Sequence, residues 1–465
     1  MMSFLLEPAM HSKLLTASIA TLCAGSPLAQ PSTQPPAQTI GAMPQLPIPN
    51  RQIIPTVHIA PATGWPDGTR PIAAAGLSVA PLATGLDHPR WVYVLPNGDV
   101  LVAESNAPPK PEDAKGIKGA IMGMMMKRAG AGVPSANRIT LLRDADGDGV
   151  AELRTTFLQG LNSPFGMALV GNNFYVANSD GIVRFPYVAG QSQITSASTK
   201  VFDLPSGPIN HHWTRNIIAS ADGSKLYATV GANSNVAENG MLVEEGRAAI
   251  WEFDIASGKG RLFATGLRNP NGMAWAGEKL WTVVNERDQL GNDLVPDYLT
   301  SVTDGAFYGW PYSYYGPNVD VRVTPPAPEL VAKAVKPDYS LGSHVAPLGL
   351  TSSEGATLPA PFNAGFFIGQ HGSWNRKPRS GYNVVFVPYD GKAMPSAQPV
   401  VVLSGFVSTS GEAYGRPVGV AIDKRGALLV ADDVGNVIWR VTSAPGGVQP
   451  APAASGYFPI PVIAE

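Results

Sequence analysis

A short pattern recurs six times along the chain, and it constrains the fold more strongly than any other feature. Each copy has a glycine or proline turn, an apolar run, a polar turn such as Asn97-Gly98 or Asp222-Gly223, and a second apolar run. Such alternation is typical of an antiparallel hairpin. The copies begin at Gly85, Gly160, Gly207, Gly266, His344 and Gly415.

The spacing between copies predicts the fold class. Their starts lie roughly 45 to 75 residues apart, which is the range of propeller blades and leaves room for four short strands in each copy. A β-sandwich would not need matched loops at one end of every repeat. We therefore expect an all-β fold, a six-bladed β-propeller of four-stranded antiparallel blades, over residues 71–442.

Composition agrees with a turn-rich, compact protein. The 465 residues include 50 glycines and 44 prolines, and charged residues make up 15%. The formal net charge is −2, and the chain has no tract of lysine and arginine. Nucleic acid is therefore not expected as a partner.

The two ends of the chain differ in composition from the repeats. Lys13 precedes a short apolar stretch at 14–22, and small residues at 24–29 offer cleavage sites, so residues 1–29 are predicted to be a signal peptide. A periplasmic or secreted location follows. The single cysteine, Cys23, lies in this segment, so no disulfide or attached haem is expected. Residues 30–70 are predicted to form a Pro-rich extended linker, and residues 443–465 a Pro/Gly-rich tail.

One insertion interrupts the first copy. Residues 116–128 contain four methionines with flanking lysines. This composition fits an adaptable surface for peripheral membrane contact or for a redox partner. It also fits a short helix packed over one end of the propeller, which is the interpretation we favour.

An acidic motif follows the insertion. Asp144, Asp146 and Asp148 alternate with small residues, as in a calcium loop, where carboxylates surround one hard cation. The position of the bidentate glutamate in a helical calcium loop is occupied by Thr155, and the flanks have the pattern of strands. The motif is therefore either a structural calcium site or an ordinary acidic hairpin turn.

The fourth copy carries the most specific sequence. Its segments 268–272, 285–293 and 305–311, in that order, resemble the soluble aldose dehydrogenases that use pyrroloquinoline quinone (PQQ). The resemblance extends from about residue 82 to 441. The L-sorbosone dehydrogenase branch is the most similar, because it shares the insertion, the acidic turn and the segment 371–376. The resemblance implies PQQ and Ca²⁺ as cofactors and an aldose or aldehyde-type sugar, such as L-sorbosone, as the substrate.

The resemblance also implies catalytic roles. His211 matches the catalytic histidine that removes a proton while a hydride passes to the quinone, and His212 is its neighbouring rival. Arg268 would stabilise the quinone oxygen as it becomes an anion, and Asn269 would position the ring edge. Without the resemblance, a histidine pair before a strand indicates a hydrogen-bonded loop, and Arg268 and Arg416 could be salt-bridge anchors between blades.

Further residues are implied as cofactor and metal ligands. Arg416 matches an arginine that binds a cofactor carboxylate, and the backbone carbonyls of Asp288 and Gln289 match the calcium ligands. The cofactor-binding lysine expected after residues 367–369 is absent, and Arg376 or His371 is predicted to replace it.

Two other departures alter the expected site. The chain has Ala232-Asn233 where the family has an aspartate that orients the base, so the partner of the histidine is unassigned. Val418 occupies the place of a second arginine. Because there is no Cys-x-x-Cys-His motif, electrons must leave to an external acceptor such as a cytochrome or quinone.

Two functions of other classes remain open. A calcium-dependent lactonase propeller would gather Asn and Glu side chains on a central metal. The candidate ligands are Asn178, Asn233, Asn269, Asn285 and Glu286. A non-catalytic sugar-binding propeller would instead use its aromatic side chains as stacking surfaces.

Overall fold

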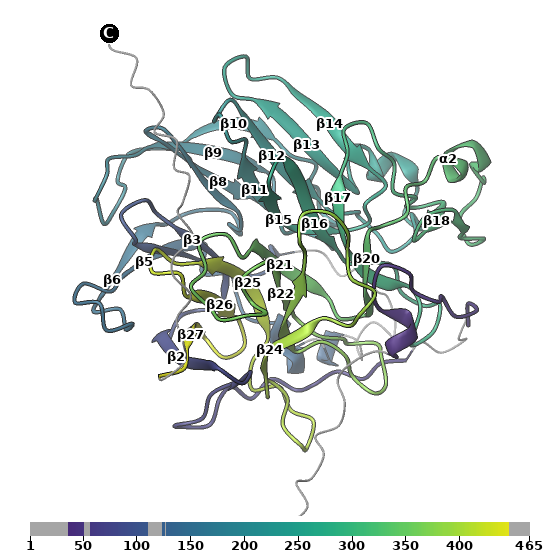
Figure 1. Cartoon of the computed structure of the whole chain (residues 1–465). Coiled ribbons are helices and arrows are strands. Elements are labelled where there is room, and N and C mark those ends of the chain that lie inside the picture. The colour runs from purple at the N-terminus through teal and green to yellow at the C-terminus, as the bar shows by residue number, and fades with distance from the viewer. Residues whose placement is uncertain (1–35, 51–55, 110–122, 126, 446–465) are drawn as a thin grey trace, which may run out of the picture.

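Six antiparallel sheets follow one another around the molecule (Figure 1). The computed structural model describes residues 36–50, 56–109, 123–125 and 127–445. The first strands of neighbouring blades contact each other, β7 with β11, β11 with β15, β15 with β21, β21 with β25 and β25 with β3. This arrangement confirms the predicted six-bladed β-propeller.

The first three blades each contain four consecutive strands. Blade one comprises β3 (Pro89–Val94), β4 (Val100–Glu104), β5 (Arg138–Arg143) and β6 (Leu153–Leu158). Blade two comprises β7 (Met167–Val170), β8 (Asn173–Asn178), β9 (Gly181–Pro186) and β10 (Thr199–Asp203). Blade three comprises β11 (Ile217–Ala219), β12 (Lys225–Val230), β13 (Ala249–Asp254) and β14 (Gly260–Thr265).

The last three blades are less regular. Blade four comprises β15 (Pro270–Ala276), β16 (Lys279–Val284), β17 (Pro296–Val302) and β20 (Tyr339–Ser343). Blade five comprises β21 (Pro347–Ser352), β22 (Gly365–Gln370), β23 (Asn383–Pro388), β24 (Val400–Ser404) and the short β1 (Ile72–Ala73). Blade six comprises β25 (Pro417–Ile422), β26 (Leu428–Asp432), β27 (Val437–Ser443) and β2 (Leu77–Ala83).

Blade six closes the ring with strands from both parts of the chain. Its outer strand β2 precedes blade one in sequence and pairs antiparallel with β27, with Leu77 opposite Ser443. Every blade thereby has a neighbour on both sides, so no inner sheet face is left uncovered. The local hairpin pattern did not predict this pairing, because the two strands are far apart in the sequence.

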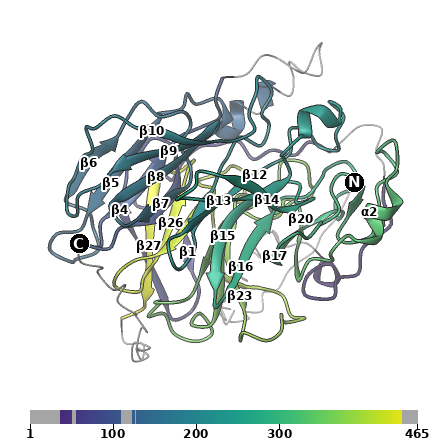
Figure 2. The ribbon, with the colours of Figure 1, turned by 90° about the horizontal axis from the view of Figure 1, so that it is seen from above.

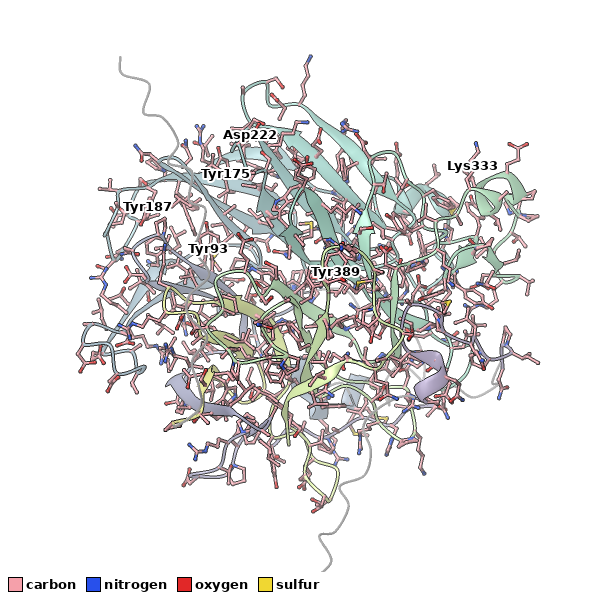
Figure 3. All side chains as sticks on the ribbon, viewed as in Figure 1. Tyr93, Tyr175, Tyr187, Asp222, Lys333 and Tyr389 are labelled. Atoms are coloured by element: carbon pink, nitrogen blue, oxygen red, sulfur yellow. The ribbon has the colours of Figure 1, made fainter. Side chains whose placement is uncertain are left out.

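Apolar side chains fill the spaces between adjacent blades. Figure 3 draws all side chains of the described residues on the ribbon. Between blades one and two, for example, Phe157 and Phe174 are fully buried with their rings 5.5 Å apart. Glycines allow the first strands to approach closely. A Cβ at Gly272 would lie 2.5 Å from the backbone nitrogen of Leu350, and one at Gly419 would lie 2.8 Å from the carbonyl oxygen of Arg90.

Short elements are inserted between the strands of several blades. Blade four carries the hairpin of β18 (Ser313–Tyr314) and β19 (Asn318–Val319), followed by α2 (Pro328–Ala332). In Figure 2, α2 lies on one side of the molecule and blades one and two lie on the other. A short η3 (Met241–Glu244) follows β12. Among the described residues, no helix is long and apolar enough to cross a membrane.

The insertion of blade one is described only in part, because residues 110–122 and 126 fall outside the described residues. Residues 123–125 are helical, and η2 (Lys127–Ala131) follows them. The backbone of Arg128 accepts a hydrogen bond from Ala62 at 2.8 Å. The described part therefore contacts the predicted linker, and packing of a helix over one end of the propeller, like contact with a membrane or redox partner, stays a prediction.

The described part of the predicted linker packs against the propeller. Gly41, just after η1 (Ala37–Thr39), pairs with Ser340, and Ala62 pairs with Ala413. Ile40 and Ala60 are buried. These residues therefore do not form a free extended connection, because their backbone pairs with two blades. The predicted signal peptide and residues 446–465 of the predicted tail lie outside the described residues.

Candidate functional site

Two loops from each blade meet at the same end of the propeller. One loop precedes the first strand, and the other follows the second strand, because an antiparallel hairpin brings these two points together. Residues from these loops line a cavity of about 1580 Å³. Its lining includes six positions predicted from sequence, which are His211, Arg268, Asn269, Asp288, His371 and Arg416.

His212, the rival of His211, is fixed by a hydrogen bond to the backbone. Its Nδ1 lies 2.6 Å from the carbonyl oxygen of Ala232. Since a carbonyl only accepts, Nδ1 carries the proton and Nε2 is left as an unprotonated acceptor. Burial, together with the positive charge of Arg268, lowers the pKa of His212 to about 3. His211 also lines the cavity but is exposed.

The backbone carbonyl of Ala232 orients the histidine in place of the aspartate that the sequence comparison led us to expect. The chain lacks a carboxylate at this place, and the backbone carbonyl orients the histidine instead. A Cβ at the preceding Gly231 would collide with Asn269 Oδ1 and His212 Cβ. Glycine at this position is therefore required for the histidine and the asparagine to lie side by side.

Arg268 is buried and held by backbone and side-chain acceptors. It donates to the carbonyl of Glu286 at 2.7 Å and to Asn235 Oδ1 at 3.0 Å, and it lies 3.4 Å from Asp288 Oδ2. Although burial opposes ionisation, His344 and Arg268 lower the pKa of Asp288 to about 2. We call His212, Arg268, Asn269 and Asp288 the His212 cluster.

A second cluster gathers around Asp433. Asp433 Oδ2 lies 2.5 Å from Arg90 Nη1, 2.8 Å from His371 Nε2 and 3.6 Å from His88 Nε2. Although burial opposes ionisation, the contacts with His371, His88 and Arg90 hold the pKa of Asp433 well below its ordinary value. Burial lowers the pKa of His371 to about 4. We call His88, Arg90, His371, Arg416 and Asp433 the Asp433 cluster.

The two predicted arginines of blades five and six lie in different surroundings. Arg416 lines the cavity, its guanidinium carbon lies 4.9 Å from the ring centre of Tyr382, and its Nε is buried without a hydrogen-bond partner among the described residues. Arg376 is absent from the described cavity lining. Its guanidinium binds Asp293 at 2.7 Å and the carbonyls of Asn292 and Pro378. Arg376 thus holds a loop, and the geometry does not support it as a cofactor ligand.

The predicted calcium ligands near the cavity fit poorly. The carbonyl oxygen of Asp288 accepts hydrogen bonds from Arg322 Nη1 at 2.9 Å and from Asn235 Nδ2 at 3.4 Å. A guanidinium at this oxygen repels a second cation and occupies a lone pair that a calcium ion needs. Asp288 therefore does not fit the predicted calcium site in this arrangement, and Gln289, which is exposed, stays a prediction.

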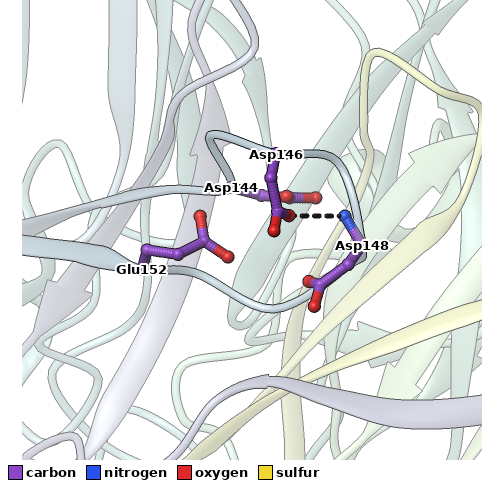
Figure 4. A group of neighbouring side chains, drawn as sticks. All are labelled: Asp144, Asp146, Asp148 and Glu152. Atoms are coloured by element: carbon purple, nitrogen blue, oxygen red, sulfur yellow. Dashed lines mark hydrogen bonds between the residues drawn. The ribbon is translucent and has the colours of Figure 1, made fainter.

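The acidic motif of blade one lies outside this cavity lining (Figure 4). Carboxylate oxygens of Asp144, Asp146, Asp148 and Glu152 lie within 4.8 Å of one another. Arg425 pairs with Asp144 at 2.8 Å, and backbone amides of the turn donate to all four carboxylates. Because these contacts also account for the turn without an ion, a structural calcium ion stays a prediction.

The candidate ligands of a lactonase-type metal are not brought together. Asn269, Asn285 and Glu286 line the cavity, but Asn178 and Asn233 are absent from its described lining. Asn233 is engaged with the carbonyl of Ile209 at 2.6 Å and with Asn239 at 2.8 Å.

Sequence reasoning missed His88, Arg90, His344 and Asp433. A signal was available, because each occupies one of the two loop positions that carry the other site residues or lies next to one. His88 stands directly before Pro89 as Asn269 stands before Pro270, and Asp433 follows β26 as Asn285 follows β16. Aligning the six copies by these loops would have found them.

Buried polar atoms without a hydrogen-bond partner gather at the cavity. Among the described residues they belong to six of its lining side chains, which are Arg90, Asn269, Glu286, Asn375, Arg416 and Asp433. Unsatisfied buried groups are rare in native proteins and often mark functional sites. The cavity is therefore lined by side chains that can form further hydrogen bonds.

Comparison with known proteins gives the chain its family. Residues 71–301 and 330–444 match the TrAA12-like family model. The PQQ-dependent pyranose dehydrogenase of Coprinopsis cinerea is 24% identical over 377 residues, which cover 71% of this chain and 46% of that protein. The chain thus spans less than half of that relative.

Solved structures share the fold. A Trichoderma reesei protein of carbohydrate-active enzyme family AA12 has a TM-score of 0.64 and 18% identity, over 85% of this chain and 100% of that one. The holo PQQ domain of the Coprinopsis cinerea pyranose dehydrogenase has a TM-score of 0.62 and 21% identity, over 83% of this chain and 100% of that one. The family match over most of the propeller confirms the resemblance seen in the sequence, and the chain belongs to the TrAA12-like family.

Proposed function

We propose that the protein is a PQQ-dependent oxidoreductase that oxidises an aldose or aldehyde-type sugar such as L-sorbosone. The observation that carries the proposal is an uncharged, oriented histidine beside a buried arginine in the central cavity. The family supports it, since the Coprinopsis cinerea relative is a PQQ-dependent pyranose dehydrogenase.

The residues present fit PQQ, a planar tricarboxylate. Arg90, Arg268 and Arg416 line the cavity, and the Nε atoms of Arg90 and Arg416 are buried donors without a partner among the described residues. Guanidinium groups are suited to carboxylates because they offer several N–H donors in one plane. We assign the carboxylates to Arg416 and Arg90, with His371 held nearby by Asp433.

The chemistry needs one proton acceptor and one site of positive charge. When bound, PQQ supplies the electrophilic quinone carbon that accepts a hydride from the substrate carbon. The proton of the substrate hydroxyl passes to Nε2 of His212, since Nδ1 is committed to Ala232. Arg268 places its charge where negative charge develops, and Asn269 offers its unpartnered Oδ1 to an N–H or O–H donor. No step is assigned to calcium.

His212 replaces His211 as our choice of base. Both histidines line the cavity, and we choose His212 because it is less exposed than His211, lies beside Arg268 and has its Nδ1 committed to Ala232. A base that is fixed before substrate arrives loses less entropy in the transition state. The reduced enzyme passes its electrons to an external cytochrome or quinone, and we propose a periplasmic or secreted location.

The proposal is tested with purified apoprotein, PQQ and an artificial electron-accepting dye. We expect a change in quinone absorbance on adding PQQ, then dye reduction with L-sorbosone or aldoses. Hydrolysis of lactones without any spectral change would instead indicate the lactonase function. Saturable sugar binding with neither activity would indicate a sugar-binding propeller, and either result would overturn the proposal.

A further inference from the structure

The segment of residues 56–66, which we call the strap, runs along the loops of blades five and six that line the cavity. The backbone nitrogen of His58 donates to the carbonyl of Trp374 at 2.7 Å. Pro61 and Thr63 pair with Ala413 at 2.7 and 2.9 Å. The strap therefore fastens two site loops that come from different blades.

The strap also contacts the guanidinium of Arg416. Arg416 Nη2 donates to the carbonyl of Ala60 at 3.3 Å, and Ala60 is fully buried. The guanidinium carbon of Arg416 also lies 4.9 Å from the ring centre of Tyr382. The guanidinium is thereby held between an aromatic ring and a strap carbonyl, while its Nε has no partner among the described residues.

The end of the strap is anchored by Trp65. Its Nε1 donates to Asp432 Oδ2 at 2.7 Å, and its ring packs against Phe406, Tyr414 and Trp439. Asp432 Oδ1 accepts the backbone N–H of Arg416 at 2.8 Å. One buried carboxylate therefore joins the strap to the backbone of Arg416, directly before the Asp433 that organises the second cluster.

We infer that Trp65, by anchoring the strap on Asp432 and so fixing the carbonyl of Ala60, is a positioning residue for Arg416 and so for the carboxylate-binding side of the cofactor site. This inference rests on the proposed function. A guanidinium that is fixed before its ligand arrives loses less conformational entropy on binding. The strap would then contribute to cofactor affinity by holding Arg416 in place.

The chain offers a matched control for the test. Trp439 Nε1 donates to the same Asp432 Oδ2, at 3.0 Å, but Trp439 belongs to β27 and not to the strap. Trp65→Phe and Trp439→Phe each remove one N–H donor from the same oxygen and keep an aromatic ring. A purely structural effect would therefore be shared by both variants.

PQQ binding to the full-length apoprotein is measured by calorimetry, alongside thermal unfolding. We expect Trp65→Phe to raise the Kd for PQQ about five- to tenfold and Trp439→Phe to change it less than twofold, with similar shifts in thermal midpoint. In an Arg416→Gln background, Trp65→Phe should add almost nothing, because the strap acts through Arg416. Additive effects, or equal effects of the two tryptophans, would overturn the inference.

If Trp65→Phe does not fold, Thr63→Ala takes its place. Thr63 is exposed, and its hydroxyl donates to the carbonyl of Ala413 at 3.3 Å. We expect a two- to threefold rise in Kd, and an unchanged Kd would count against the strap. Failure of the wild type to bind PQQ would refute the proposed function, whereas normal binding by the strap variants would refute only this inference.

Discussion

The two clusters of the cavity use histidine in opposite ways. His212 donates a hydrogen bond to a backbone carbonyl and has Arg268 as its charged neighbour, whereas His371 is bound to the carboxylate of Asp433. The carbonyl orients the ring, while burial and the charge of Arg268 keep His212 neutral and able to accept a proton. A carboxylate ties His371 into a network with Arg90. From this difference in partners we infer that His212 serves proton transfer and that the network of His371 helps to hold the ligand.

The largest expected effect comes from removing the proposed base. His212→Asn should lower turnover by about 10² to 10⁴-fold, because general base catalysis contributes about that much. PQQ affinity should stay within a few fold of the wild type. The matched control is His211→Asn, which should keep most of the activity in the dye assay. If His211→Asn abolished turnover and His212→Asn did not, the assignment would be reversed.

Asp433→Asn should break the second cluster. Arg90 and His371 would lose a buried carboxylate, and removing one partner of a buried ion pair costs about 3 to 5 kcal/mol of stability. We expect a lower thermal midpoint and a Kd for PQQ raised at least tenfold, measured by calorimetry. At saturating PQQ, turnover should fall less than fivefold. If Asp433→Asn lost most of its turnover but kept its affinity for PQQ, the proposed separate roles of the two clusters would be wrong.

The pH dependence of activity should report the environment of His212. Because burial and Arg268 lower its pKa to about 3, the base stays unprotonated well below the ordinary histidine value of 6.5. The acid limb of kcat/KM should therefore lie below pH 6.5. Arg268→Gln should move that limb upward, since one cause of the lowered pKa is removed. If the acid limb of the kcat/KM profile did not move in Arg268→Gln, Arg268 would not lower the pKa of His212.

The smallest effect concerns stability. The folded-state pKa values of His212 and His371, about 3 and 4, lie below the ordinary value of 6.5, so the folded protein binds fewer protons than the unfolded chain between these values. The contribution of these two histidines to the free energy of unfolding is fully present above pH 6.5 and is lost as the pH falls toward 4. The thermal midpoint should fall over this range, and His371→Gln should weaken the dependence.

The sequence predicted the blades well because each hairpin is a local feature. Alternating runs around Asn97-Gly98 or Asp222-Gly223 need only their own residues to form a turn and two strands. The pairing of β2 with β27 could not be predicted in this way, since it joins residues near opposite ends of the chain. The strap was missed for the same reason, because its Pro-rich composition resembles a linker while its partners lie in blades five and six.

Site residues could be predicted where a sequence motif identifies them. They could not be predicted where the choice between neighbouring residues depends on their contacts in the folded structure. Arg268 and Arg416 follow from the motif and its place in the repeat, and both line the cavity. His211 and His212 are adjacent, and the sequence does not reveal that His212 binds the carbonyl of Ala232 while His211 is exposed. Arg376 and His371 occupy one segment, but the loop directs the arginine to Asp293 and the histidine to Asp433.

The most direct test of the division between the clusters is a stopped-flow measurement of cofactor reduction by sugar in a single turnover. Wild type, His212→Asn and Asp433→Asn are each saturated with PQQ and mixed with substrate without dye. The account predicts that His212→Asn reduces its bound cofactor at least a hundredfold more slowly than the wild type. Asp433→Asn should react within fivefold of the wild type. Fast reduction in His212→Asn, or slow reduction confined to Asp433→Asn, would contradict it.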